Sequence, residues 1–154
     1  MKKSRFFVLA IAALAFAGCI GEDETDTLTQ DQASEALDAT MAAIRDVDIA
    51  LKEGIGLEID TTASCAEGGS VGVHGTVEEF GRLKLDLDFN ACVESSITMD
   101  GSLDYRFAVA SSEKTLKGRV TFSGRVEGTC SLEFTHSYGS TGLTIKGIVC
   151  GSRF

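Results

Sequence analysis

The chain has 154 residues, with 23 acidic and 14 basic side chains and a formal net charge of −9. This length corresponds to a single domain with one hydrophobic core, and a hydrophobic content of 44% is too high for a chain that is disordered throughout. The negative charge argues against a nucleic-acid partner, because attraction to phosphates requires a basic surface.

The first 17 residues have the features of an export signal. Residues 1–5 contain three basic side chains, and residues 6–17 form an unbroken apolar run. A run of this length is too short to cross the roughly 30 Å hydrocarbon core of a bilayer as a helix. It is typical of a secretory signal peptide with its positive and apolar regions.

The apolar run ends in Phe16-Ala17-Gly18-Cys19, which resembles the lipobox of bacterial lipoproteins. The resemblance concerns the signal region alone. It implies that Cys19 is the lipid attachment site, that cleavage occurs before it, and that the new amine is usually acylated as well. An ordinary secretory signal followed by a free cysteine is the alternative. The odd number of five cysteines favours the lipoprotein, since four remain without Cys19.

This interpretation divides the chain into a signal peptide (1–18), an acidic tether (19–28) and a single domain (29–154). The lipid anchors the protein to a membrane of the cell envelope, since two or three acyl chains hold a protein stably on a bilayer. The resemblance also bears on sorting. Ile20 stands where the enterobacterial inner-membrane signal has Asp, which favours the outer membrane where the organism has one.

Residues 29–53 are predicted to form an amphipathic helix. Thr29 and Gln32 fit a capping box at its start, and Gly54 and Gly56 end it. We expect the apolar stripe to pack in the core, and a partner-binding helix is the alternative. The stripe consists of Ala33, Leu37, Met41, Ile44, Val47 and Leu51.

From residue 55 the hydrophobic period changes to two, which indicates β-strands. The predicted fold class is α+β, with the N-terminal helix packed on a curved antiparallel meander of six to seven strands. A sheet that rolls further would form a partly open barrel. The expected strands cover 57–64, 70–77, 82–90, 96–109, 116–126, 130–138 and 143–150.

The expected register pairs apolar residues with apolar residues on one face of the sheet. The pairs are Val77 with Leu83, Leu87 with Met99, Val109 with Leu116, and Val126 with Cys130. One resulting row contains three glycines at one level, which would leave a shallow groove. Close packing of the helix, an apolar ligand such as an acyl chain, or a strongly bent sheet would each explain it. The row reads Gly75, Leu85, Gly101, Gly124, Leu132 and Val149.

The four remaining cysteines are expected to form disulfides in the exported compartment. Strand positions favour Cys65–Cys92 and Cys130–Cys150, and a bulge near Gly147 or Gly151 would align the second pair. A zinc site is the rival interpretation, but no C-x-x-C pair occurs and the spacings fit no zinc finger. We therefore expect neither a metal nor another cofactor.

The chain has two histidines, which are its candidate catalytic bases. His74 is expected on the polar face of its strand. His136 is expected on the apolar face in a row with Tyr105, Val120 and Ile145, hydrogen-bonded to a neighbour such as Tyr105. A base or ligand role is the alternative, but no motif places a nucleophile beside His136, so no catalytic residue is assigned.

The acidic segment 86–90 begins like a calcium-binding loop, but Ala91 and Ile97 stand where that motif needs Gly and Glu. Strand alternation explains the segment more simply. It makes Asp86 and Asp100 neighbours on the polar face, with Arg125 beyond Asp100. A cation site or acid–base pair is the functional interpretation of these carboxylates, and a solvated ladder is the other.

Three functional classes follow. The first is a non-enzymatic envelope lipoprotein that interacts with another envelope protein or has a structural role. The second is a carrier of an apolar, lipid-like ligand in the glycine-lined groove. The third is a hydrolase or metal-dependent enzyme that uses His136 or the Asp86 and Asp100 pair. The first is favoured, because the sequence shows no catalytic set.

Overall fold

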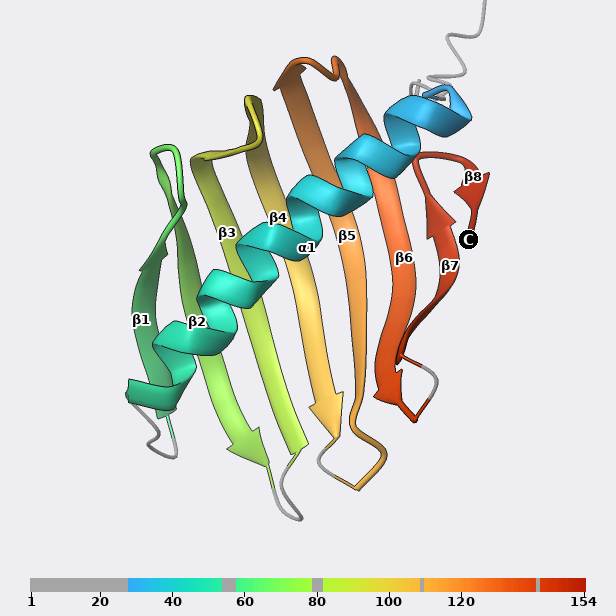
Figure 1. Ribbon diagram of the computed structural model, residues 1–154. Helices are drawn as coiled ribbons and strands as arrows, with labels where there is room; N and C mark the ends of the chain where they lie inside the picture. Colours follow the sequence, from blue (N-terminus) through green and yellow to red (C-terminus); the bar gives the residue numbers. More distant parts are fainter. Residues whose placement is uncertain (1–27, 54–57, 79–81, 109, 141) are drawn as a thin grey trace, which may run out of the picture.

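The computed structural model describes residues 28–53, 58–78, 82–108, 110–140 and 142–154. Within these residues the fold is mostly β with one helix, and is roughly α+β (Figure 1). The sheet is antiparallel, and its strands follow one another in chain order. The elements are α1 (Gln30–Glu53), β1 (Glu58–Ser64), β2 (Ser70–Glu78), β3 (Arg82–Glu94), β4 (Ile97–Ala108), β5 (Glu113–Gly124), β6 (Gly128–Gly139), β7 (Gly142–Val149) and β8 (Ser152–Arg153).

Helix α1 begins with a reciprocal cap. The Thr29 backbone N–H donates to the Gln32 side-chain oxygen at 3.1 Å, and the Gln32 N–H donates to the Thr29 hydroxyl at 3.3 Å. This is the capping box that the sequence predicted. The helix then crosses one face of the sheet diagonally, from the β6–β8 side towards β1 (Figure 1).

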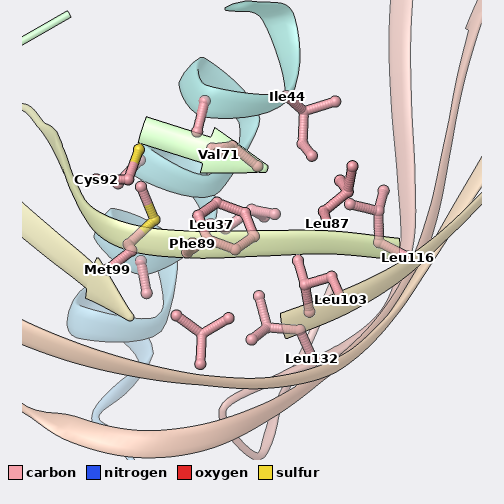
Figure 2. Packing of buried hydrophobic residues seen from close by; sticks show 14 of the residues in the cluster. Leu37, Ile44, Val71, Leu87, Phe89, Cys92, Met99, Leu103, Leu116 and Leu132 are labelled. Carbon is pink, nitrogen blue, oxygen red and sulfur yellow. The ribbon is translucent and has the colours of Figure 1, made fainter. Parts of the chain in front are cut away.

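The core lies between α1 and the sheet. Figure 2 shows Leu37 and Ile44 of the helix among side chains from several strands, including Phe89 and Leu103. The helix stripe is buried as expected, except that Met41 is only half-buried. Burial of these apolar side chains supplies the main driving force for folding.

The sheet has eight strands in the described residues, one more than the largest predicted number. The additional strand, β8, follows a two-residue turn at Cys150 and Gly151, whose φ angles are 50° and 83°. Two consecutive positive φ angles are typical of a tight hairpin turn. The sheet does not close into a barrel, because β1 and β8 form its two edges.

The predicted register is right between β2 and β3, where Val77 faces Leu83. It is wrong between β3 and β4. Leu87 faces Leu103, and Met99 faces Cys92, because a bulge interrupts β3 between Phe89 and Cys92. The strand continues to Glu94 and turns only at Ser95 and Ser96, instead of ending at residue 90.

The next two pairings also differ from the prediction. Leu116 faces Tyr105 rather than Val109, which lies outside the described residues. Cys130 faces Val120 rather than Val126, because Val126 belongs to the turn between β5 and β6. The physical reason is the same in both cases. The apolar pattern placed β5 a few residues too far along the chain, so the turns before and after this strand were misplaced.

Candidate functional site

Four polar side chains lie together on the helix side of the sheet, and we call them the Asp48 cluster: Asp48, Tyr105, Lys114 and His136. The Tyr105 hydroxyl donates to Asp48 Oδ1 at 3.1 Å, and the Lys114 ammonium donates to Asp48 Oδ2. Lys114 and His136 are register partners on β5 and β6. One helix and three strands therefore each contribute one member of the cluster.

Lys114 is well enclosed, with 16% of its side chain exposed, against 30% for Asp48. Its Nζ lies 5.9 Å from the centroid of the Tyr105 ring and 5.7 Å from that of Phe107. A cation over aromatic faces is attracted by the ring quadrupole. The Asp48 carboxylate and two rings thus hold the ammonium group at the edge of the core.

His136 is 2% exposed, and neither of its ring nitrogens has a hydrogen-bond partner among the described residues. Its ring centroid lies 6.4 Å from that of Phe134 and 6.3 Å from that of Tyr138. Burial lowers the pKa of His136, the charge of Lys114 lowers it further, and Asp48 opposes this in part. The imidazole is therefore neutral at physiological pH.

Burial also raises the pKa of Tyr105, and the negative charge of Asp48 adds to the effect. The phenol stays protonated and acts as a hydrogen-bond donor. Within the cluster, the Asp48 carboxylate thus accepts hydrogen bonds from Tyr105 and Lys114, and these bonds join α1 to β4 and β5. His136 is left as a neutral group beside these residues.

The environment predicted for His136 is only partly right. Ile145 is its neighbour, as expected, but Lys114 occupies the place given to Val120, and Phe107 on β4 occupies the place given to Tyr105. A hydrogen bond from Tyr105 to His136 is excluded, because the Tyr105 hydroxyl donates to Asp48. His74 lies on the polar face and pairs with Asp60 at 2.9 Å.

The predicted row of three glycines does not form. Gly75 faces Leu85 as expected, but Gly101 faces Val120 and Gly124 faces Ile97, so the glycines lie at three different levels. The far end of the row, Leu132 opposite Val149, is correct. The register errors at β3–β4, β4–β5 and β5–β6 explain the difference.

The space beside these glycines is occupied by neighbouring strands. A Cβ atom at Gly75 would lie 2.1 Å from the Lys84 carbonyl oxygen, and one at Gly101 would lie 2.5 Å from that of Arg119. Both glycines have positive φ angles, of 154° and 133°. They allow close approach of adjacent backbones, and they do not line a groove for a ligand.

The carboxylates of the polar face are also arranged differently. Asp86 faces Asp104 instead of Asp100. Asp100 accepts a hydrogen bond from the Ala91 N–H at 2.8 Å. Arg125 pairs with Glu35 of α1 at 2.8 Å rather than with the Asp100 carboxylate. Residues 86–90 belong to β3, as strand alternation predicted, and do not form a calcium-binding loop.

Both expected disulfides are present. Cys65 and Cys92 have Cα atoms 5.5 Å apart, and Cys130 and Cys150 have Cα atoms 4.8 Å apart. The φ angle of 50° at Cys150 provides the local bend near Gly151 that the pairing required.

Glu94 is a buried acid that the sequence did not single out. Its carboxylate lies near the sulfurs of Cys65 and Cys92, within 4.8 Å. These sulfurs are joined to each other, so they are not available as thiolate ligands. Glu94 accepts the Ala66 N–H at 2.8 Å, and burial is the main cause of its raised pKa. The group therefore anchors the turn after β1.

The sequence also contains a serine-hydrolase-like motif. Residues 68–72 read Gly-Gly-Ser-Val-Gly, which matches the G-x-S-x-G pattern of many serine hydrolases. That pattern requires a sharp turn from a strand into a helix. Ser70 instead begins β2 and pairs with Ser64 and Asn90 in the sheet. The structural context does not support a nucleophile here.

Two exposed apolar side chains are neighbours on strands β6 and β7. In the described part of the chain the large exposed hydrophobic residues are Tyr138 (65%), Leu143 (45%) and Ile148 (47%). Tyr138 of β6 and Leu143 of β7 face each other on the helix side of the sheet, whereas Ile148 lies on the opposite face, beside Glu133. Exposed apolar residues at one location are typical of an interaction site.

The lipobox-like segment and Cys19 lie outside the described residues. Among the residues that the structure does describe, no helix is long and apolar enough to cross a membrane.

Comparison with known proteins found no family model, no curated protein and no solved structure that matches this chain.

Proposed function

We propose that this protein is a lipid-anchored lipoprotein of the cell envelope, and that its folded part is a non-enzymatic protein-interaction module. The observation that carries the proposal is the lipobox-like segment ending in Cys19, ahead of a fold with two disulfides. Disulfides persist in exported proteins and are rare in the cytosol. The anchor and the disulfides therefore point to the same compartment.

The arrangement of the elements supports a role in protein interaction. Helix α1 begins at the end of the sheet where the β3–β4, β5–β6 and β7–β8 turns lie, and the β6–β7 turn lies at the opposite end (Figure 1). The tether (19–28) would join the first end to the membrane, while Tyr138 and Leu143 lie towards the opposite end of the sheet and are exposed to a protein partner.

The other functional classes have less support. The glycines of the predicted ligand groove lie at different levels and contact neighbouring backbone, so no observation favours an apolar-ligand carrier. The members of the Asp48 cluster that are paired join the helix to the sheet, which is a structural role. Among the described residues, neither ring nitrogen of His136 has a hydrogen-bond partner, so no hydroxyl or thiol is hydrogen-bonded to it as in a nucleophile–base pair.

The anchor is tested with the full-length chain in a bacterial host. Wild-type protein should sediment with membranes and incorporate an alkyne-labelled fatty acid, and the Cys19→Ala variant should do neither. The double variant Cys65→Ala/Cys92→Ala is the matched control, because it loses two cysteines but keeps the anchor. Unlabelled wild-type protein, or a Cys19→Ala variant that stays in the membrane fraction, would refute the lipoprotein proposal.

The interaction role is tested by photo-crosslinking in the same cells. A benzophenone amino acid at Tyr138 should give a discrete protein adduct, and the same probe at Thr62 on the β1 edge should give none. Equal adducts at both positions, or none at either, would contradict a specific surface on β6 and β7.

A further inference from the structure

Only part of the outer edge of β7 is covered. In strand β8, Ser152 is the register partner of Val149. Further along β7, the Gly147 N–H donates to the Phe154 carbonyl oxygen at 3.2 Å, and the Phe154 N–H donates to the Gly147 carbonyl oxygen at 3.0 Å. Beyond Gly147, no described residue pairs with the outer edge of residues 142–146. A five-residue edge therefore remains free between the β6–β7 turn and Phe154.

The direction of the peptide groups along this edge follows from Gly147. In an antiparallel strand, the N–H and C=O of one residue point to the same side, and successive residues alternate. Because both groups of Gly147 point away from β6, those of Ile145 and Leu143 point away as well. Two N–H and two C=O groups thus face outward in the row that another strand would pair with.

The side chains of the edge suit a strand partner. Leu143 and Ile145 lie on the helix side of the sheet, and Leu143 is exposed next to Tyr138. Lys146 is the only charged residue of the free edge. The opposite edge of the sheet, β1, carries Glu58 and Asp60 and contacts α1. Charged residues and covering elements are the usual protection of an edge strand, and residues 142–146 have little of either.

We propose that this edge binds a second copy of the same chain, with the two β7 strands antiparallel about a twofold axis at Thr144. In this register, Leu143 of each copy forms a hydrogen-bonded pair with Ile145 of the other, so all four outward groups of each copy are satisfied. Lys146 falls opposite Gly142 of the second copy, so no like charges meet. Strand β7 of the second copy ends at its β6–β7 turn. From Gly147 onward, the outer edge of β7 in the first copy is already covered by Phe154 of that same copy.

Charge and length favour a second copy over an unrelated strand. The chain is acidic overall, but the free edge carries one positive and no negative charge, so two copies approach there with the least repulsion. The two free segments have the same length and are self-complementary, as an isologous dimer interface requires. The contact is small compared with a standard interface of roughly 800 Å² per partner, so we expect a reversible dimer.

This inference names the partner of the interaction surface proposed above and rests on that part of the proposed function, but it does not need the lipid anchor. The Cys19→Ala experiment therefore tests the anchor separately. The dimer is tested by cysteine crosslinking in the full-length protein, in intact cells.

Thr144 lies on the twofold axis in a non-hydrogen-bonded pair, where the two Cα atoms are about 4.5 Å apart. This is within the range of about 4.4–6.8 Å that a disulfide spans. A Thr144→Cys variant should give a covalent dimer in more than half of the molecules on non-reducing gels. Lys146→Cys is the matched control, with its two Cα atoms about 14 Å apart at roughly 3.4 Å per residue. It should give at least tenfold less dimer.

The outcomes separate the possibilities. Thr144 is exposed, so its replacement should leave the fold intact. Melting temperatures of both variants close to that of the wild type would verify this. Equal crosslinking at both positions would reject the register, and a monomer at both would reject the dimer. A Thr144→Cys adduct with a different protein would overturn the second copy as the partner and leave the interaction role standing. If the probe at Tyr138 also gave no adduct, the interaction role would fail as well.

Discussion

The Asp48 cluster allows a quantitative test of what joins the helix to the sheet. The Asp48→Ala variant removes the acceptor of both the Tyr105 hydroxyl and the Lys114 ammonium. A hydrogen bond to a charged group contributes about 1.5–3 kcal/mol. Loss of the ion pair adds about 1 kcal/mol, because both partners keep some contact with water. The higher helix propensity of Ala offsets about 0.5 kcal/mol.

The net expectation is a loss of about 2–3.5 kcal/mol of unfolding free energy. Urea unfolding of the oxidised protein, followed by circular dichroism, measures this value directly. Asp38→Ala is the matched control, since Asp38 is exposed on the same helix, and it should change stability by less than about 0.5 kcal/mol. If Asp48→Ala behaved like Asp38→Ala, the cluster would not hold the helix, and our account of its role would be wrong.

Three further predictions concern His136, a disulfide and a glycine. Because burial lowers the pKa of His136, the unfolded chain binds the proton more tightly, so stability should fall as the pH drops below about 6.5. His136→Gln should flatten this part of the stability–pH curve, and an unchanged slope would refute the assignment. Replacing Cys65 and Cys92 by Ala should cost about 3–4 kcal/mol in denaturant unfolding, because the bridge spans 27 residues. Gly75→Ala should lower stability by about 2 kcal/mol or more, because its Cβ would meet a carbonyl oxygen, whereas Gly139→Ala, with open space around it, should be nearly neutral.

The sequence predicted the strands better than their pairing. Strict alternation identified β3 and β5 to within a few residues, since one face is buried and the other is wet. The pairing failed first at Ala91, whose φ of 46° inserts a bulge into β3. Alternation restarts after the bulge with Cys92 and Glu94 facing the core. A strand prediction that uses only the hydrophobic period places the end of the strand at such an interruption.

The candidate site depended on the same register. Burial of His136 was predictable from its place in the β6 pattern, but its neighbour Lys114 was not, because the β5–β6 turn was misplaced. Asp48 was missed for another reason. It follows Val47 of the helix stripe, and only the diagonal crossing of α1 decides whether a side chain there meets the sheet. The orientation of a helix on a sheet is a property of the whole packed core.

The positions of the covalent and polar links explain how one helix can cover so wide a sheet. Both disulfides lie at the end of the sheet where α1 begins, and the ion pair of Glu35 with Arg125 fastens the helix at that end. The Asp48 cluster fastens the later part of the helix to β4 and β5. Neither set of contacts reaches the free edge of β7, where Leu143 remains exposed. In the described chain, Tyr138 and Leu143 are therefore apolar side chains on the helix side of the sheet that α1 does not cover.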